Sequence, residues 1–520
     1  MSFSKVHSAQ SHLLQARVID IEVDLAKGLY QFSVVGLPDK AVEESKDRIG
    51  AAIKNSGFTS PKHKNQKVVI SLAPADLKKE GPNFDLAMAL GYLLAADDIK
   101  FDPREKLFLG ELSLNGKLRA IKGVLPLVIE AKQHHFKEVY VPMENVREAA
   151  IITDIDVFGV ATLKEAVEHL NEKRPAEPAA SSPPKLSPAP STPILYEMTE
   201  YEIDFGDIRG QEKAKRGLEI AAAGAHNVLM FGPPGTGKTM LAKAFCHLLP
   251  PLSFSEMLEV TSIHSVSGNL GNTPLILYPP FRSPHHTSSY PALIGGGTIP
   301  KPGEVTLAHR GVLFMDEFPE FDRRVIDALR EPLEEKVVSV ARTKSSAIFP
   351  ANFILMAAMN PCPCGNRGSK NKECLCRSQN LLNYERKLSG PILDRIDLWL
   401  EVSEIDYKKL GSERSGETTD DFKERVLKAR ARSKERLAKS GLNILTNNEI
   451  RPKDLLTLVP LQKKVREILD QAAYKLNISA RAYHRLIKVA RTIADLEEKE
   501  EVEVNHMLEA LQYRPKKVEI

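Results

Sequence analysis

The chain has 520 residues, enough for several domains that each bury a core of their own. Its hydrophobic share of 42% and charged share of 27% are ordinary for a globular protein, and a net charge of +4 does not by itself indicate a nucleic-acid partner. The sequence has no apolar run of membrane-spanning length and no signal-peptide layout at its N-terminus, so we expect a cytoplasmic protein with reduced thiols.

Residues 1–171 predict an N-terminal α+β or α/β domain. Alternating apolar residues predict strands at 16–25, 31–35 and 67–72, and helical periodicity predicts helices at 40–55 and 84–95. Residues 172–196 are rich in Pro, Ala and Ser, a composition typical of a semi-extended linker. The linker precedes a nucleotide-binding core at 197–403 and a mainly helical region at 404–520.

One eight-residue motif after the linker predicts a phosphate-binding loop. A short apolar strand at 226–231 precedes it and a helix at 240–249 follows it, which is the context that such a loop requires. The loop residues are Gly232, Pro233, Pro234, Gly235, Thr236, Gly237, Lys238 and Thr239. Backbone N–H groups would cradle phosphate, Lys238 would reach the β- and γ-phosphates of ATP, and the Thr239 hydroxyl would hold Mg²⁺. The alternative is an ordinary glycine-rich turn.

Two later strands supply the remaining polar groups of such a site. The strand at 311–315 ends in Asp316-Glu317, so that Asp316 can reach the Mg²⁺ held by Thr239 and Glu317 can polarise the attacking water. An acidic pair at a helix N-terminus is the alternative. Asn360 ends the strand at 352–359, where its amide either orients the water or acts only as a turn residue before proline.

These motifs, followed by Leu393-Asp-Arg395-Ile-Asp397, stand in the order found in AAA+ ATPases. The segments FRSPHHTSS, MAAMNPCPCG and SARAYHRLIKVARTIADL resemble the Mg-chelatase-like branch, specifically the ComM/YifB family, and the resemblance runs nearly end to end. It implies an α/β fold with an AAA+ phosphate-loop core and a helical lid. It also implies a homo-oligomeric ring, a hexamer, with ATP sites between subunits.

The resemblance assigns roles to further residues. Arg395 would be the arginine finger, although an arginine between two aspartates also suits an internal salt bridge. Arg481 would be the second-sensor arginine on the lid, with Arg485 as the alternative one helical turn later. The candidates for contact with DNA in a central pore are Arg282, His285, His286 and Arg342. For the histidines, ordinary loop hydrogen bonding is the alternative.

Four cysteines follow Asn360 closely: Cys362, Cys364, Cys374 and Cys376. Four thiolates suit tetrahedral Zn²⁺, but each pair is separated by one residue rather than the usual two, so that reduced free thiols are the alternative. The fifth cysteine, Cys246, lies in the apolar helix after the phosphate loop, where it is expected to pack.

The N-terminal segment LAPADLKKEGPNFDLAMALGYL resembles the Lon-protease-like domain. Asn83 stands where Lon has its nucleophilic serine, so peptidase activity is disfavoured and a scaffold or DNA-contacting tier is expected.

The resemblance to ComM implies an ATP-driven motor that unwinds or migrates branched DNA in recombination or natural transformation. The basic helix at 422–439, with eight Lys or Arg and two Glu, fits either a contact with phosphate backbones or a solvated lid surface. The first alternative is a Mg-chelatase-type ATPase that remodels a protein partner. The second is a ring scaffold that only binds nucleotide.

Overall fold

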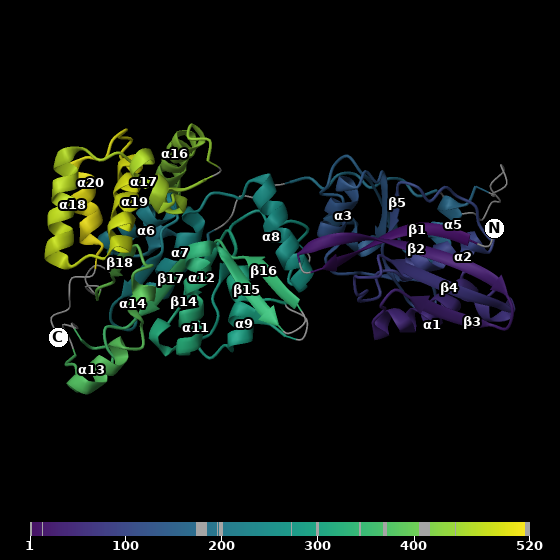
Figure 1. Cartoon of the computed structure of the whole chain (residues 1–520). Coiled ribbons are helices and arrows are strands. Elements are labelled where there is room, and N and C mark those ends of the chain that lie inside the picture. Colours follow the sequence, from purple (N-terminus) through teal and green to yellow (C-terminus); the bar gives the residue numbers. More distant parts are fainter. Residues whose placement is uncertain are drawn as a thin grey trace. The chain divides into compact units, whose positions relative to one another are not determined.

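The chain folds into two compact units in the computed structural model (Figure 1). The structure describes residues 3–12, 14–172, 185–194, 196, 201–271, 273–297, 301–342, 345–367, 372–404, 416–442 and 444–514. The first unit comprises Met1–Tyr196 and Leu258–Ile276, and the second comprises Glu197–Met257 and Leu277–Ile520. Most of the predicted linker at 172–196 lies outside the described residues, as does the segment after the predicted boundary at 404.

A seven-stranded mixed sheet in the order β3-β4-β2-β1-β5-β8-β9 organises the first unit. Its strands are β1 (Phe3–His12), β2 (Gln15–Lys27), β3 (Gln31–Val35), β4 (Gln66–Ala73), β5 (Lys106–Phe108), β8 (Glu138–Pro142) and β9 (Asp156–Val160), beside a small hairpin of β6 (Glu111–Leu112) and β7 (Leu118–Arg119). The helices are α1 (Lys40–Asn55), α2 (Asp85–Ala95), α3 (Val124–Gln133), α4 (Val146–Ala149) and α5 (Leu163–Leu170). The predicted strands and helices of this domain are therefore confirmed, with shifts of a residue or two at their ends.

The sequence did not predict β1, which lies near the middle of the sheet. Its residues are mostly polar, yet Ser4 and Ser8 are buried and each hydroxyl donates a hydrogen bond of 2.7 Å to a backbone carbonyl, of Gly91 and Phe108 respectively. A buried hydroxyl with a partner avoids most of the desolvation penalty, so a polar segment can occupy the sheet interior.

Helix α8 (Phe254–Ser267) belongs partly to the first unit, although the sequence places it within the nucleotide-binding core. The Ser265 hydroxyl donates a short hydrogen bond to Glu148, and the same carboxylate accepts the N–H of Leu125 at 3.1 Å. Burial raises the pKa of Glu148, although these two bonds oppose the shift. The stretch 258–276 therefore belongs to the first unit, and its residues Val260, Ile263 and Ser265 are buried.

A five-stranded parallel sheet in the order β11-β14-β17-β10-β18 forms the centre of the second unit. Its strands are β10 (Val228–Phe231), β11 (Phe281–Arg282), β14 (Val312–Met315), β17 (Ile354–Met359) and β18 (Leu398–Glu401). Two small hairpins join β12 (Gly295–Gly296) to β13 (Lys301–Pro302) and β15 (Val337–Arg342) to β16 (Ser345–Pro350). The predicted strands before the phosphate loop, before Asp316 and before Asn360 are confirmed as β10, β14 and β17.

Helices surround this sheet and build the lid (Figure 1). Those of the core are α6 (Glu212–Gly224), α7 (Lys238–Leu248), α9 (Tyr290–Ile294), α10 (Glu304–Leu307), α11 (Arg323–Ala328), α12 (Arg330–Glu335), α13 (Ser378–Glu385) and α14 (Gly390–Leu393). Those of the lid are α16 (Thr419–Ala438), α17 (Pro452–Leu458), α18 (Lys463–Leu476), α19 (Ala480–Leu496) and α20 (Val504–Gln512). Core and lid share one hydrophobic cluster, in which Val228 and Met356 of the sheet and Ile487 of α19 are fully buried.

The fully enclosed carboxylate of Asp397 joins three parts of the second unit. It accepts the backbone N–H of Asn227 at 2.8 Å and the guanidinium of Arg485, on the lid helix α19, at 2.6 Å. Burial alone would raise the pKa of Asp397, but Arg485 and the nearby His226 outweigh it and hold the pKa well below its usual value. Asp397 therefore stays ionised and links the start of β10, the segment before β18 and the lid.

We predict that Asp397→Asn destabilises the protein by about 3–5 kcal/mol, because Arg485 is left buried without an anion. Urea unfolding measures the loss, with Asp394→Asn as the matched control, since its side chain forms no ion pair among the described residues. A lowered native pKa stabilises the fold above the unfolded pKa of about 3.9. The difference from wild type should therefore be constant between about pH 5 and 8 and shrink below about pH 4. Equal stability of the two variants would contradict the assignment.

Candidate nucleotide site

The phosphate loop lies between β10 and α7, at the carboxyl edge of the parallel sheet. Lys238, only 8% exposed, donates to the carbonyls of Gly232 and Pro233 at 2.8 Å and to Oδ1 of Asn360 at 3.2 Å. Burial lowers the pKa of Lys238, and Asp316 opposes the shift. All three of these acceptors are uncharged, so the ammonium is well placed to exchange them for a phosphate anion.

Close backbone approach explains the first glycine of the loop. A Cβ at Gly232 would lie 1.9 Å from the carbonyl oxygen of Val402, which follows β18. No side chain fits there, because real atoms never come so close. Gly235 and Gly237 have φ values of +76° and +91°, in the left-handed region that glycine tolerates at little cost.

Thr239 and Asp316 meet as a Mg²⁺ site requires. The Thr239 hydroxyl donates to Oδ2 of Asp316 at 2.9 Å, although the two residues come from α7 and the end of β14. Neighbouring oxygens of an octahedral Mg²⁺ are about 3.0 Å apart, given Mg–O distances of about 2.1 Å. The spacing of the two oxygen atoms therefore fits Mg²⁺, and their role as its ligands stays a prediction.

Glu317 is exposed and touches a residue that the sequence did not associate with it. Its carboxylate lies 3.2 Å from Nδ1 of His286, whose ring packs 4.2 Å from that of His285. Both histidines follow β11, which pairs with β14 in the sheet. His286, predicted to contact DNA, thus lies against Glu317, the predicted catalytic acid. The two residues are far apart in the sequence, so no local sequence pattern predicts this contact.

The other DNA-contact candidates divide into two cases. Arg282 forms a bidentate pair with Glu304 at 2.6 and 2.8 Å, so its guanidinium already has an anionic partner. Arg342 ends β15, and its side chain lies outside the described part of the chain. Among the described residues, no hydrogen bond or ion pair joins Arg282 to His285 or His286.

The predicted finger and lid arginines share one carboxylate on α12. Glu334 receives Arg395 at 2.7 Å on one oxygen and Arg481 at 3.1 Å on the other. Arg395 thus has an internal ion pair, with Glu334 rather than with a flanking aspartate. Arg485, held by buried Asp397, has a structural partner, whereas the Arg481 side chain is 55% exposed. The geometry therefore favours Arg481 over Arg485 as the arginine that can meet a ligand.

The four cysteines after β17 come together. Their sulfur atoms lie within 4.8 Å of one another, and the sulfur–sulfur distances from Cys362 to Cys364 and Cys374 are 3.4 and 3.7 Å. A tetrahedral Zn²⁺ with Zn–S distances of about 2.3 Å needs sulfur atoms about 3.8 Å apart. Hydrogen bonds from the Asn366 N–H and the Cys362 thiol lower the pKa of Cys364 to about 6. The cluster has the ligand set and spacing of a metal site.

The cysteine loop also lies against the phosphate loop. A Cβ at Gly365 would come within 2.8 Å of Cδ of Pro234, so the two loops are in close contact at this glycine. Asn360, which precedes the cysteines, joins the phosphate loop to α13: its side chain accepts from Lys238, and its backbone carbonyl accepts from the Tyr384 hydroxyl at 3.1 Å.

The basic helix α16 differs from what its charge count suggested. Arg425 and Arg436 bind Glu219 and Asp495, and Arg430 donates twice to the carbonyl of Ala222 at the end of α6. Lys428 and Lys439 pair with glutamates of the same helix. Arg425 and Arg430 therefore join the lid to the core, and Arg436 joins α16 to α19 within the lid. With so many of its basic residues already paired, the helix gives little support to a DNA contact.

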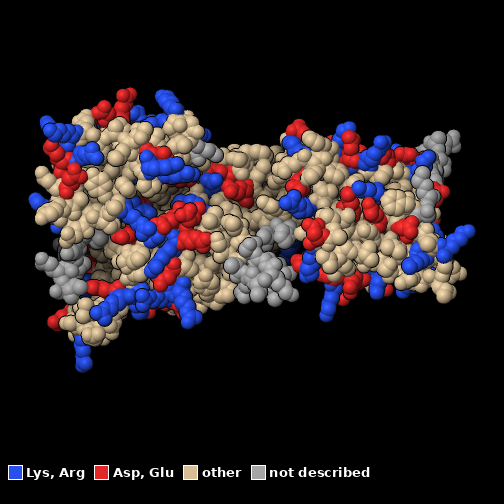
Figure 2. All heavy atoms as spheres, in the orientation of Figure 1, with Lys and Arg blue, Asp and Glu red and all other residues tan. Residues whose placement is uncertain are grey.

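Figure 2 shows Lys and Arg mixed with Asp and Glu over the face that it draws, without an extended surface of one sign. Within the described residues, no helix is both long and apolar enough to span a membrane.

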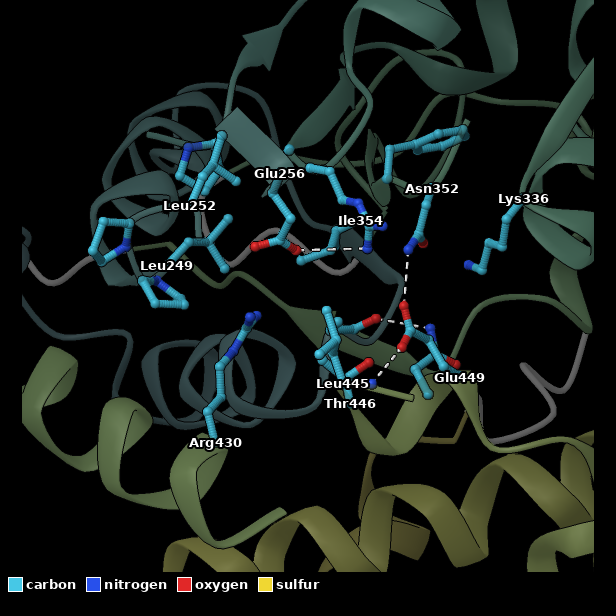
Figure 3. A pocket seen from close by; sticks show the side chains of 18 residues that line it. Leu249, Leu252, Glu256, Lys336, Asn352, Ile354, Arg430, Leu445, Thr446 and Glu449 are labelled. Atoms are coloured by element: carbon cyan, nitrogen blue, oxygen red, sulfur yellow. Dashed lines mark hydrogen bonds and ion pairs between the residues drawn. The ribbon is translucent and has the colours of Figure 1, made fainter. Parts of the chain in front are cut away.

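A cavity of about 80 Å³ lies at the amino edge of the same sheet, opposite the phosphate loop (Figure 3). Asn352 and Glu449 face each other there at 2.8 Å, and Lys336 and Arg430 also line the cavity. Asn352, Arg310 and Arg430 have hydrogen-bond or ion-pair partners there. The cavity lies between core and lid, and the phosphate loop lies at the other edge of the sheet.

Comparison with known proteins extends over most of the chain. Residues 204–410 match the family model "Magnesium chelatase, subunit ChlI", residues 21–145 match "Subunit ChlI of Mg-chelatase", and residues 416–514 match "Magnesium chelatase, subunit ChlI C-terminal". Competence protein ComM of Haemophilus influenzae is 41% identical over 99% of this chain and 98% of its own length. YifB of Escherichia coli is 40% identical over 99% of this chain and 97% of its own length. Lon protease 2 of Bacillus subtilis is 35% identical over 20% of this chain and 19% of its own length.

The parallel sheet, the phosphate loop with its acidic partners and these matches agree with the resemblance seen in the sequence. An AAA+ core of this kind uses ATP and Mg²⁺. The chain belongs to the Mg-chelatase-like AAA+ ATPases, within the group that contains ComM and YifB.

Proposed function

We propose that the protein is an ATP-hydrolysing ring motor that acts on DNA. The observation that carries the ATPase part is the convergence of Lys238, Thr239, Asp316, Glu317 and Asn360 at one edge of a parallel sheet. The choice of DNA rests on the similarity to ComM, which is named a competence protein, and the proposed reactions are unwinding and branch migration. The proposed ring is a hexamer with its ATP sites between subunits.

Each residue of the site has a task in phosphoryl transfer. Lys238 exchanges its carbonyl partners for the β- and γ-phosphates and stabilises their charge. Glu317 orients the attacking water and draws its proton, and Asn360 fixes that water or senses the γ-phosphate. Thr239 and Asp316 would hold Mg²⁺, which would neutralise phosphate charge when bound. Arg395 and Arg481 stabilise the charge that develops in the transition state.

A chelatase-type ATPase that remodels a protein partner is the second candidate. It is favoured by the family models, which carry the magnesium chelatase name, and by the internal partners of the basic residues on α16. A scaffold that only binds nucleotide would need neither Glu317 nor the arginines. The experiments below separate the three candidates.

Glu317→Gln should lower the ATP turnover rate by about 10²–10⁴-fold, because an amide cannot draw a proton from water. The isosteric side chain should leave ATP binding and assembly intact. Turnover by phosphate release, nucleotide affinity and sedimentation measure these effects. Glu320→Gln is the matched control, since Glu320 lies three residues on and pairs with Lys387. Undiminished turnover in Glu317→Gln would show that another residue activates the water.

Single-stranded or branched DNA should raise the ATPase rate of the full chain severalfold, and the stimulation should weaken as salt rises, because phosphate contacts release counterions. Lys238→Ala provides the blank, since it removes the buried ammonium from the phosphate loop. An ATPase rate that no form of DNA changes would contradict the DNA proposal and support a protein partner. If the wild-type chain did not hydrolyse ATP at all, the remaining candidate would be a scaffold that only binds nucleotide.

We also propose that the four clustered cysteines bind one structural Zn²⁺, which orders the loop in contact with Pro234. Purified, EDTA-washed protein should retain about one zinc per chain by elemental analysis. Cys364→Ser with Cys376→Ser should lower this to below about 0.1 zinc and reduce the melting temperature. Cys246→Ser, outside the cluster, should keep the zinc. If the wild-type protein retained no zinc, the four cysteines would be reduced free thiols rather than metal ligands.

A further inference from the structure

Glu334 stands out because it bonds two functional arginines at once. Its carboxylate lies on the short helix α12, while Arg395 precedes β18 in the core and Arg481 opens the lid helix α19. The Arg395 guanidinium bonds one oxygen at 2.7 Å, and that of Arg481 bonds the other at 3.1 Å. The two arginines are therefore neighbours in space, although 86 positions separate them in the sequence.

The surroundings of the two guanidinium groups differ. The Arg395 side chain is 5% exposed and also donates to the carbonyl of Pro391 at 2.5 Å, whereas that of Arg481 is 55% exposed. Two adjacent cations repel each other, more strongly where water is excluded. One carboxylate between them offsets this repulsion and restricts the rotamers of two long side chains, which otherwise cost entropy to order.

We propose that Glu334 is a positioning residue that holds Arg395 and Arg481 as one cationic pair, directed to the phosphates of a single nucleotide. The inference rests on the proposed ATPase function. Among the described residues, no hydrogen bond or ion pair links this pair to Lys238, Thr239 or Asp316 of the same chain. In the proposed ring, whose ATP sites lie between subunits, the pair would face a nucleotide held by a second copy of this chain, where core and lid would act together.

The arrangement makes the two arginines interdependent. The exposed Arg481 contacts the phosphates directly, and the buried Arg395 adds positive potential next to it. Glu334 holds both guanidinium groups in position. Without the carboxylate, Arg395 is left buried with a single carbonyl partner and Arg481 is free to change rotamer. Glu334 does not touch the nucleotide, so its loss should reduce kcat for ATP and leave KM nearly unchanged.

Steady-state ATPase assays of the full chain test the proposal. Glu334→Ala should lower kcat at least about tenfold with KM within about twofold. Glu334→Gln, which keeps hydrogen-bond acceptance without charge, should fall between Glu334→Ala and wild type. Glu335→Ala is the matched control, since Glu335 is the next residue of α12 and forms no ion pair among the described residues; it should match wild type.

Double-mutant analysis separates positioning from a merely structural role. In an Arg395→Ala, Arg481→Ala background, Glu334→Ala should cause no further loss of kcat, because its effect passes through the arginines. A further loss that multiplies with the others would show a general structural role and overturn the proposal. So would a wild-type rate in Glu334→Ala while the wild-type chain hydrolyses ATP, and that result would leave the proposed function standing. A wild-type chain that does not hydrolyse ATP would overturn both.

Discussion

The buried carboxylate of Asp397 is the contact on which the nucleotide-binding unit depends. It receives a backbone N–H from the start of β10 and a guanidinium from the lid, and it follows Arg395 by two residues. Asn227 strengthens the same junction, since its side chain accepts the N–H of Leu355 at 2.9 Å and donates to the carbonyl of Arg395 at 3.1 Å. The start of β10, the segment that contains Arg395 and the lid are thus held together at Asp397 and Asn227. Arg395 and Arg485 therefore keep a defined position relative to the sheet.

Much of the nucleotide site could be predicted because each of its motifs is a short stretch of consecutive residues. A phosphate loop needs glycines, a lysine and a hydroxyl at fixed spacing, and the acids follow buried strands whose apolar runs are easily read. Parallel strands then bring these segments to one edge of the sheet, which is how Thr239 reaches Asp316 across 77 positions. The N-terminal strands and helices with clear periodicity, such as α1 and β3, were predicted for the same reason.

The missed features depend on partners that lie far away in the sequence. The charge of α16 was counted correctly, but the count does not reveal that Glu219 and Asp495 receive its arginines. Neither the contact of His286 with Glu317 nor that of Glu334 with two arginines has a local signature. The polar strand β1 was overlooked because its hydroxyls find backbone acceptors only after the sheet has formed.

Residues 258–276 have a consequence for how the protein can be divided. The chain leaves the first unit at Tyr196, returns to it at Leu258 and leaves again at Ile276, so that three peptide connections join the units instead of one. Cleavage in the proline-rich segment cuts only one of these three connections. The two fragments should then stay associated without a covalent link, because residues 258–276 of the second fragment pack in the first unit. A truncated protein that begins after the linker would keep 258–276 but lose its core, including the Glu148 partner of Ser265. The two units are therefore not interchangeable modules, and a gene fusion or deletion that respects only sequence order would cut through a folded core.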